Sequence, residues 1–329
     1  MLKRDGTAAR QLRDQVQALR DSDPDLVRAI EREFGVQPAP LPGLDPAAPL
    51  PPGGIWEGGA PEMVMQAIIW RKGRPALAVR GGSFDPADPD DPEASVLLDR
   101  LEGARARLEP LIPAVGRIEV EGNAEGELAG TGWLVAPEIV VTNAHVAQKF
   151  AMRFGAGYRF RASVLGDGRQ SARIDFLAEA GSDCADEIAI REILWIAPDG
   201  QPDIALLGLE RAAKAPPIPL AEDSPQAGTH VAAVGYPVRD GEYPDPALMD
   251  AIFQGLYTHK CLSPGMVRGS TGSVMHDCST LRGNSGSPVI DMGSGLAVGL
   301  HFLGGRLQGD NYAVPAHVLS DRLAGLQLI

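Results

Sequence analysis

The chain has 329 residues, of which 44% are hydrophobic, and a formal net charge of −13 at pH 7. This length allows one large domain or two ordinary ones, and the apolar content is typical of globular proteins. The negative charge argues against nucleic acid and anionic membrane surfaces as partners, because both require a basic face on the protein.

Cysteine use and the N-terminal residues indicate where the protein works. The three cysteines, Cys184, Cys261 and Cys278, form no disulfide framework and lack the spacing of zinc ligands. The first six residues lack the apolar core of a signal peptide, and no stretch approaches the ~20 apolar residues of a membrane span. We therefore expect a cytoplasmic protein that uses no metal and no cofactor.

The first 54 residues are expected to form a helical segment followed by a linker. Residues 7–34 carry apolar side chains at helical spacing, with a break at Ser22-Asp23-Pro24, and predict two helices. Residues 36–54 are rich in proline, which predicts a stiff spacer. The helix pair either packs on the rest of the chain or docks a partner.

Residues 55–113 are expected to form a small α+β extension. Met63–Trp70 and Pro75–Val79 predict a hairpin around a turn at 72–74. The acidic run at 85–93 lacks the alternating ligands and the glycine of a calcium loop, so we interpret it as a solvated loop.

A helix is predicted next, over residues 93–109. Its expected apolar face consists of Val96, Leu97, Leu101 and Leu108.

From residue 114 onward the pattern changes to short strands separated by glycine and proline. Strands in a first half are expected at 115–120, 132–136, 139–142, 172–178, 188–197 and 203–209. After a crossing at 216–220, strands are expected at 231–237, 287–290, 295–303 and 311–314, with a closing helix at 315–326. Residues 238–265 are expected to be a long loop that acts as a lid or specificity loop, because structureless loops of that length are uncommon without a role.

Residues 280–288 carry the strongest chemical signal in the chain. Ser285 lies between Asn284 and Gly286, and Gly283 comes two residues before it. The glycines allow a sharp turn that exposes the serine hydroxyl and aims backbone N–H groups at one point. Taken alone, the same residues also fit an ordinary turn.

Two upstream motifs favour catalysis over a simple turn. His145 follows Thr142-Asn143-Ala144 at the end of an apolar run, and Asp203 opens another apolar run. The order His145, Asp203, Ser285 is that of the chymotrypsin triad and differs from the subtilisin and α/β-hydrolase orders. None of the five other histidines follows Thr-Asn-Ala, and none of the competing aspartates begins an apolar strand.

With these motifs, and with Gly130–Val135 before the histidine, the chain resembles the trypsin/chymotrypsin-like serine peptidases. The likeness is to their disulfide-free bacterial branch, the HtrA-type and glutamyl endopeptidases, over roughly residues 114–320. It implies a mostly β fold with two six-stranded antiparallel barrels in a domain over residues 114–329, at about 114–215 and 216–329. The N-terminal α+β extension and a C-terminal helix would flank these barrels.

The resemblance also implies a role for each residue of the site. Ser285 would be the nucleophile, His145 the general base and then acid, and Asp203 the group that orients the imidazole. The N–H groups of Gly283 and Ser285 would form the oxyanion hole. Asn284 stands where relatives activated by cleavage carry an aspartate, so pairing with a freshly cut N-terminus is not expected.

Ser279, Thr280, His301 and Gly304 are the expected substrate pocket. A threonine hydroxyl and an imidazole can both hydrogen-bond a carboxylate or carboxamide, as in glutamyl endopeptidases and picornavirus-type cysteine proteases. A protonated imidazole would favour glutamate at the P1 position of the substrate, and a neutral one glutamine. His301 also fits a buried strand histidine bonded to the core.

We therefore expect a serine endopeptidase that acts on a protein or peptide substrate inside the cell and cleaves after Glu or Gln. Residues 1–110 are the candidate for control by a regulatory protein. A catalytically silent protein that uses the barrels as an interaction scaffold is the alternative, and an esterase using the same triad is a further one.

Overall fold

The structure, a computed structural model, describes residues 74–86, 92–123, 127–164, 168–241, 245–304 and 310–328. The described residues other than 199–201 belong to one compact unit, which holds every element named below. The helices predicted at 7–34, the linker at 36–54, the first arm of the hairpin at 63–70 and most of the acidic run lie outside the described residues.

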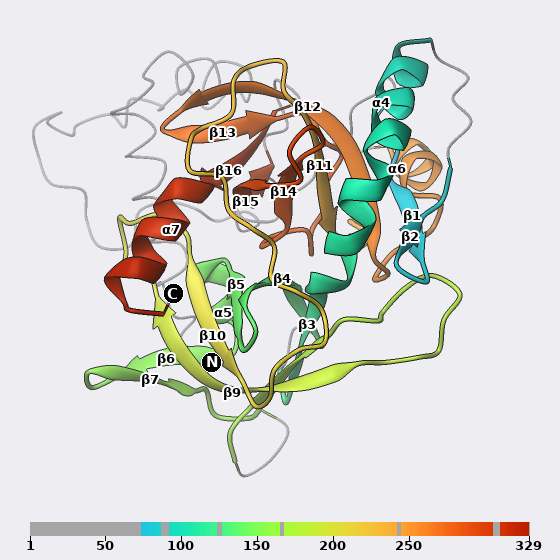
Figure 1. Cartoon of the computed structure of the whole chain (residues 1–329). Helices are drawn as coiled ribbons and strands as arrows, with labels where there is room; N and C mark the ends of the chain where they lie inside the picture. The colour runs from blue at the N-terminus through green and yellow to red at the C-terminus, as the bar shows by residue number, and fades with distance from the viewer. Residues whose placement is uncertain are drawn as a thin grey trace, which may run out of the picture. The chain divides into compact units, whose positions relative to one another are not determined.

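Six antiparallel strands close into a first barrel (Figure 1). Around the barrel they follow the order β10-β5-β4-β3-β8-β9. In chain order their bounds are β3 Val115–Glu121, β4 Leu128–Ala136, β5 Ile139–Thr142, β8 Ser171–Asp175, β9 Glu187–Ile196 and β10 Ala205–Leu209. Large apolar side chains such as Trp133, Leu134 and Ile174 are fully buried, and because successive strand residues point to opposite faces, apolar side chains pack on both faces of this sheet.

Six further strands form a second closed barrel, in the order β11-β14-β15-β16-β13-β12 with β12 pairing back onto β11. Their bounds are β11 His230–Gly235, β12 Cys261–Thr271, β13 Ser273–His276, β14 Pro288–Asp291, β15 Ala297–Gly304 and β16 Asn311–Pro315. Helix α7, Ala316–Gly325, follows the last strand. The predicted fold class of two six-stranded barrels with a C-terminal helix is confirmed.

The predicted loop at 238–265 is wrong, since the segment contains a helix and the start of a long strand. Helix α6, Pro246–Phe253, begins at Asp245, whose carboxylate accepts from Leu248 N at 3.0 Å. Strand β12 begins at Cys261 and continues through Pro264, which pairs with Ala232 of β11. The proline conceals the strand in the sequence, because proline usually excludes a central strand.

Other elements were missing from the prediction. The hairpin of β6, Ala151–Phe154, and β7, Gly157–Phe160, and strand β13 have no counterpart in it. The predicted second arm of the N-terminal hairpin corresponds to β1, Leu77–Arg80, which pairs with β2, Ser83–Phe84, and with β12. Figure 1 shows β1 and β2 beside the end of β12.

Helix α4, Pro92–Leu108, and the 3₁₀ helix η1, Glu109–Ala114, complete the segment before the first barrel. Leu97, Leu101 and Leu108 of the predicted apolar face are buried, but Val96 is 59% exposed, so its placement on that face is wrong. A helix face about 100° wide holds residues three or four apart, and Val96 lies one position beside Leu97. Within the described residues, none of the helices has the length and apolar character needed to cross a membrane.

Candidate active site

His145 is held by an aspartate that comes from the neighbouring strand of the first barrel. Strand β5 ends at Thr142, and His145 lies in α5, Ala144–Ala147, a single helical turn that follows. Strand β10 pairs with β5, and Asp203 precedes β10 by two residues. The pairing therefore brings the two predicted residues together across 58 positions of sequence.

Two hydrogen bonds fix the His145 side chain on Asp203. The imidazole Nδ1 donates to Asp203 Oδ2 at 2.6 Å, and the backbone N–H of His145 donates to Oδ1 at 3.1 Å. The carboxylate is 3% exposed, and Asn143 Nδ2 donates to the Asp203 carbonyl at 2.9 Å. With its proton held at Nδ1, the imidazole presents Nε2 as a base. In the described part of the chain Nε2 is buried and has no hydrogen-bond partner.

Ser285 lies in the turn between β13 and β14, and strand β4 of the first barrel holds this turn. The N–H of Thr131 donates to the Ser285 carbonyl at 2.9 Å, and the Thr131 hydroxyl donates to the Gly283 carbonyl at 2.7 Å. A Cβ at Gly130 would meet both Val146 Cγ2 at 2.9 Å and the Ser285 carbonyl at 3.1 Å. The serine turn and the residue after His145 therefore adjoin the same point of β4.

The turn also has the backbone geometry that an oxyanion hole requires. Gly283 and Gly286 both have φ of +90°, and a Cβ at Gly283 would collide with the Tyr236 carbonyl. Within the described residues, the N–H groups of Gly283 and Ser285 have no acceptor, whereas the intervening Asn284 N–H donates to Leu281 O. Unpaired N–H groups of the nucleophile itself and of the residue two positions before it are an arrangement that can stabilise an oxyanion.

Two of the predicted pocket residues, Thr280 and Gly304, adjoin Asn311, a residue that the sequence analysis missed. Its Oδ1 accepts from the Thr280 hydroxyl at 2.8 Å, and its Nδ2 donates to the Cys278 carbonyl. Across the sheet, Asn311 pairs with Gly304 on one side and with His276 on the other. An asparagine at the start of an apolar strand was the only signal for it in the sequence.

His301 is buried beside a second histidine. Its Nδ1 lies 3.3 Å from His276 Nε2, and the two rings meet edge to face with centroids 5.3 Å apart. The backbone of His301 joins the serine turn, since its carbonyl accepts from Gly286 N at 2.8 Å and its N–H donates to Ser287 O at 2.9 Å. Burial lowers the pKa of His276 to about 4.

Burial also lowers the pKa of His301 well below its usual range, and the positive charge that His276 or His145 would carry lowers it further. At neutral pH both buried rings are therefore uncharged.

Ser279 does not bind Asn311, the partner of Thr280, but contacts Arg74 instead. Its hydroxyl is fully buried and donates to the Arg74 carbonyl at 2.6 Å. Arg74 also binds Asp277 through its side chain, and neither of these residues was among the predicted site residues. Only a tertiary contact across more than 200 positions of sequence reveals this pair.

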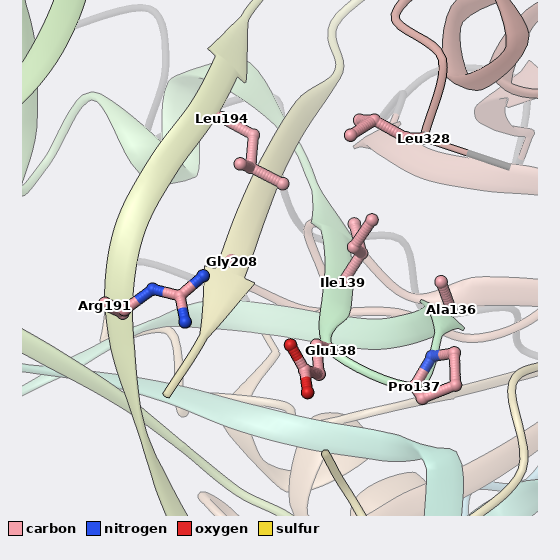
Figure 2. Close-up of a pocket in the computed structure, with 8 residues that line it drawn as sticks. All are labelled: Ala136, Pro137, Glu138, Ile139, Arg191, Leu194, Gly208 and Leu328. Carbon is pink, nitrogen blue, oxygen red and sulfur yellow. The ribbon is translucent and has the colours of Figure 1, made fainter. Parts of the chain in front are cut away.

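Figure 2 shows a separate surface pocket of about 440 Å³ on the first barrel, between the β4–β5 turn, β9, β10 and Leu328. Ile139, the first residue of β5, lines it, whereas His145 follows the last residue of that strand. The pocket is therefore at the far end of β5 from the candidate site. Within the described ranges, no group of three or more His, Cys, Asp or Glu side chains is placed to hold a metal ion.

Comparisons with known proteins found similar solved structures and a matching family model. Among solved structures, the chain is similar to an inactive form of Rv3671c from M. tuberculosis H37Rv that carries a serine-to-alanine substitution, with 18% identity and a TM-score of 0.42. That match covers 68% of this chain and 90% of the other. A second inactive form of the Rv3671c protease matches with 19% identity and a TM-score of 0.42, over 67% and 92% of the two chains.

None of the curated proteins matches the chain in sequence. Residues 130–300, just over half of the chain, match the family model of the trypsin-like peptidase domain. This region contains His145, Asp203 and Ser285. The chain belongs to the trypsin-like peptidase domain family.

Proposed function

We propose that the chain is a serine endopeptidase whose triad consists of His145, Asp203 and Ser285. The observation that carries this proposal is the part-buried Nδ1–Oδ2 hydrogen bond of 2.6 Å, which leaves Nε2 of His145 free to act as a base. Nε2 and the Ser285 hydroxyl share no hydrogen bond in the described residues, and such bonds often tighten only when substrate binds.

The proposed reaction proceeds through an acyl-enzyme. His145 Nε2 takes the Ser285 proton while the serine oxygen bonds to the substrate carbonyl carbon, and Asp203 stabilises the resulting imidazolium. The N–H groups of Gly283 and Ser285 bind the oxyanion. The imidazolium then gives its proton to the departing amine as the peptide bond breaks. A water molecule, deprotonated by the same imidazole, hydrolyses the ester and restores Ser285.

For the P1 residue, the buried environment supports glutamine over glutamate. A carboxylate would have to lose its hydration beside His301, whose pKa is lowered well below its usual range and which therefore offers no positive charge at neutral pH. The Thr280 hydroxyl donates its proton to Asn311, so it offers a ligand only an acceptor. A carboxamide N–H can use that acceptor, and a carboxylate cannot.

The His276–His301 contact also supports glutamine at P1, because it determines which nitrogen of His301 carries a proton. One ring must donate across the 3.3 Å contact, and His276 Nδ1 is buried without a partner in the described residues. Because an orphaned buried N–H is rarer than an orphaned acceptor, we assign the donating proton to His276 Nε2. Neutral His301 then carries its own proton on Nε2, where it can donate to the carbonyl oxygen of a glutamine side chain.

Two experiments test the proposal. A fluorophosphonate probe should label the wild-type chain, and labelling should be lost in Ser285→Ala; an unlabelled wild type would favour the scaffold alternative. Peptides that differ only at P1 should be cleaved with Gln preferred over Glu by about tenfold or more, since unpaired buried polar groups discriminate strongly. A preference for Arg or Lys would contradict the pocket assignment.

The cellular substrate is also part of the proposal. The proposed target is a protein, and residues 1–110 are the candidate for binding a regulatory protein. Comparing new N-termini in a cell extract treated with wild type or with Ser285→Ala would test the first point. Removing residues 1–73, which leaves Arg74 and β1 in place, would test the second by its effect on peptide cleavage.

A further inference from the structure

A residue that precedes both barrels is built into the wall of the substrate pocket. The guanidinium of Arg74 donates from Nε to Asp277 Oδ1 at 3.0 Å and from NH2 to Oδ2 at 2.9 Å. The carbonyl of Arg74 accepts from the Ser279 hydroxyl at 2.6 Å. Arg74 therefore binds two residues of the segment 277–280, which leads to Thr280 and then to Ser285.

The Arg74–Asp277 ion pair is largely shielded from solvent, so its loss would leave an unpaired charge inside the protein. The Asp277 side chain is 1% exposed and that of Arg74 is 11% exposed. Asp277 Oδ1 also accepts from the backbone N–H of Met266 on β12, at 2.7 Å. A bidentate guanidinium–carboxylate contact fixes orientation as well as distance. Without Arg74, the carboxylate would be a buried charge with no counter-ion, which the surroundings must relieve by moving.

The segment 277–280 is clamped from both sides. Asp277 and Ser279 bind Arg74, whereas Asn311 binds the Thr280 hydroxyl and the Cys278 carbonyl. Loss of either clamp would free the segment to shift, and the Thr280 hydroxyl would shift with it.

Strand β1 anchors Arg74 in this position. Leu77 and Ala78 pair with Leu262 and Cys261 of β12, and Ala76 N donates to Ile252 O of α6 at 3.2 Å. The same strand β12 binds Asp277 through Met266. Both partners of the ion pair thus rest on one strand of the second barrel.

We infer that Arg74 is a positioning residue for substrate selection, which sets the P1 wall by holding Asp277 and Ser279. This inference rests on the proposed peptidase function and extends it. The segment before the barrels then serves as a structural part of the specificity pocket. Its proposed effect on peptides passes through the wall, because Arg74 holds Asp277 and Ser279.

The test compares Arg74→Met with Arg80→Met in the full chain. Arg80 is a matched control from β1, whose guanidinium contacts Asp85 and the Ala180 carbonyl and no residue of the pocket wall. The assay measures kcat and KM on two peptides that differ only at P1, Gln and Ala, together with the rate of fluorophosphonate labelling. The probe reacts with Ser285 and does not depend on a P1 side chain.

Arg74→Met should lower kcat/KM for the Gln peptide by about tenfold to a hundredfold, mainly through KM, as expected for a displaced binding group. The Gln/Ala ratio should fall towards one, and the loss of cleavage should exceed the loss of labelling by about tenfold. Arg80→Met should keep the wild-type ratio. Arg74→Met/Asp277→Asn should recover part of the ratio, because the buried charge is removed together with its partner.

An unchanged Gln/Ala ratio in Arg74→Met would overturn the inference, and so would equal losses of cleavage and labelling. If Arg74→Met does not fold, Arg74→Lys and Asp277→Asn replace it, and an unchanged ratio in both would overturn it as well. Absence of labelling in the wild type would instead contradict the proposed function. If the wild type is labelled and prefers Gln, but the Arg74 variants keep the wild-type Gln/Ala ratio, the proposed peptidase function stands. Only the positioning role of Arg74 is then contradicted.

Discussion

Asp203 binds His145 twice, through Oδ2 to the imidazole Nδ1 at 2.6 Å and through Oδ1 to the backbone N–H at 3.1 Å. The first bond selects the tautomer, and the second fixes the helical turn on which the imidazole is mounted. A carboxylate accepts one bond on each of its two oxygens, which an amide cannot do because its NH₂ group only donates.

Asp203→Asn should therefore reduce peptide cleavage severely while leaving the fold in place. Loss of the correct tautomer in a triad of this kind lowers kcat by about 10⁴. The measurement is kcat on the Gln peptide alongside the melting temperature, with Asp250→Asn, an exposed ion-pair residue, as the control. Activity within about tenfold of wild type would show that Asp203 does not orient the base.

Gly283→Ala should impair the oxyanion hole. The residue has φ of +90°, and an added Cβ would meet the Tyr236 carbonyl and approach Val238 Cγ2 to 2.8 Å, so the backbone must rotate. Losing one oxyanion donor lowers kcat by about 10²–10³. Gly241→Ala is the matched control, since an added Cβ there meets nothing within 4 Å. Equal kcat in the two variants would contradict the assignment.

The buried His276 should make stability fall with acid. Burial lowers its pKa from 6.5 to about 4, so the unfolded chain binds more protons than the folded chain between these values. Its stabilising contribution is complete above about pH 6.5 and is lost as the pH falls towards 4, with an upper limit on the order of 3 kcal/mol.

Urea unfolding at pH 7, 5.5 and 4.5 measures this effect. His276→Gln should flatten the decline in unfolding free energy between pH 7 and 4.5, whereas His317→Gln on α7 should not. Parallel declines for wild type and His276→Gln would show that other groups govern the acid sensitivity.

Lys260→Met should destabilise the protein because it leaves the buried carboxylate of Glu179 without its cationic partner. Lys260 is fully buried, donating to the Phe176 carbonyl at 2.8 Å and the Ile112 carbonyl at 3.3 Å, and it lies 3.4 Å from Glu179 Oε1. Breaking a buried ion pair at one partner costs about 3–5 kcal/mol. Denaturant unfolding should show that loss, with partial recovery in Lys260→Met/Glu179→Gln; a loss within 0.5 kcal/mol, the usual range for surface substitutions, would contradict the argument.

The sequence predicted most strands of the two barrels because short apolar runs and glycine or proline breaks are local signals. It failed where local and tertiary preferences conflict. Pro264 favours a loop in the sequence, yet it lies within β12 because β11 pairs with that strand on both sides of the proline. Val96 was assigned to the apolar face of the predicted helix, but it is exposed because helical spacing places it beside that face.

The candidate catalytic residues could be named from the sequence alone, because the chemistry requires particular residue types in recognisable local motifs, and those motifs occur in a diagnostic order. The partners that tune the pocket could not. His276 with His301, Asn311 with Thr280, and Arg74 with Asp277 are contacts between residues 25, 31 and 203 positions apart. Strand register and barrel closure bring these side chains together, and no local pattern of residues encodes a register between distant strands.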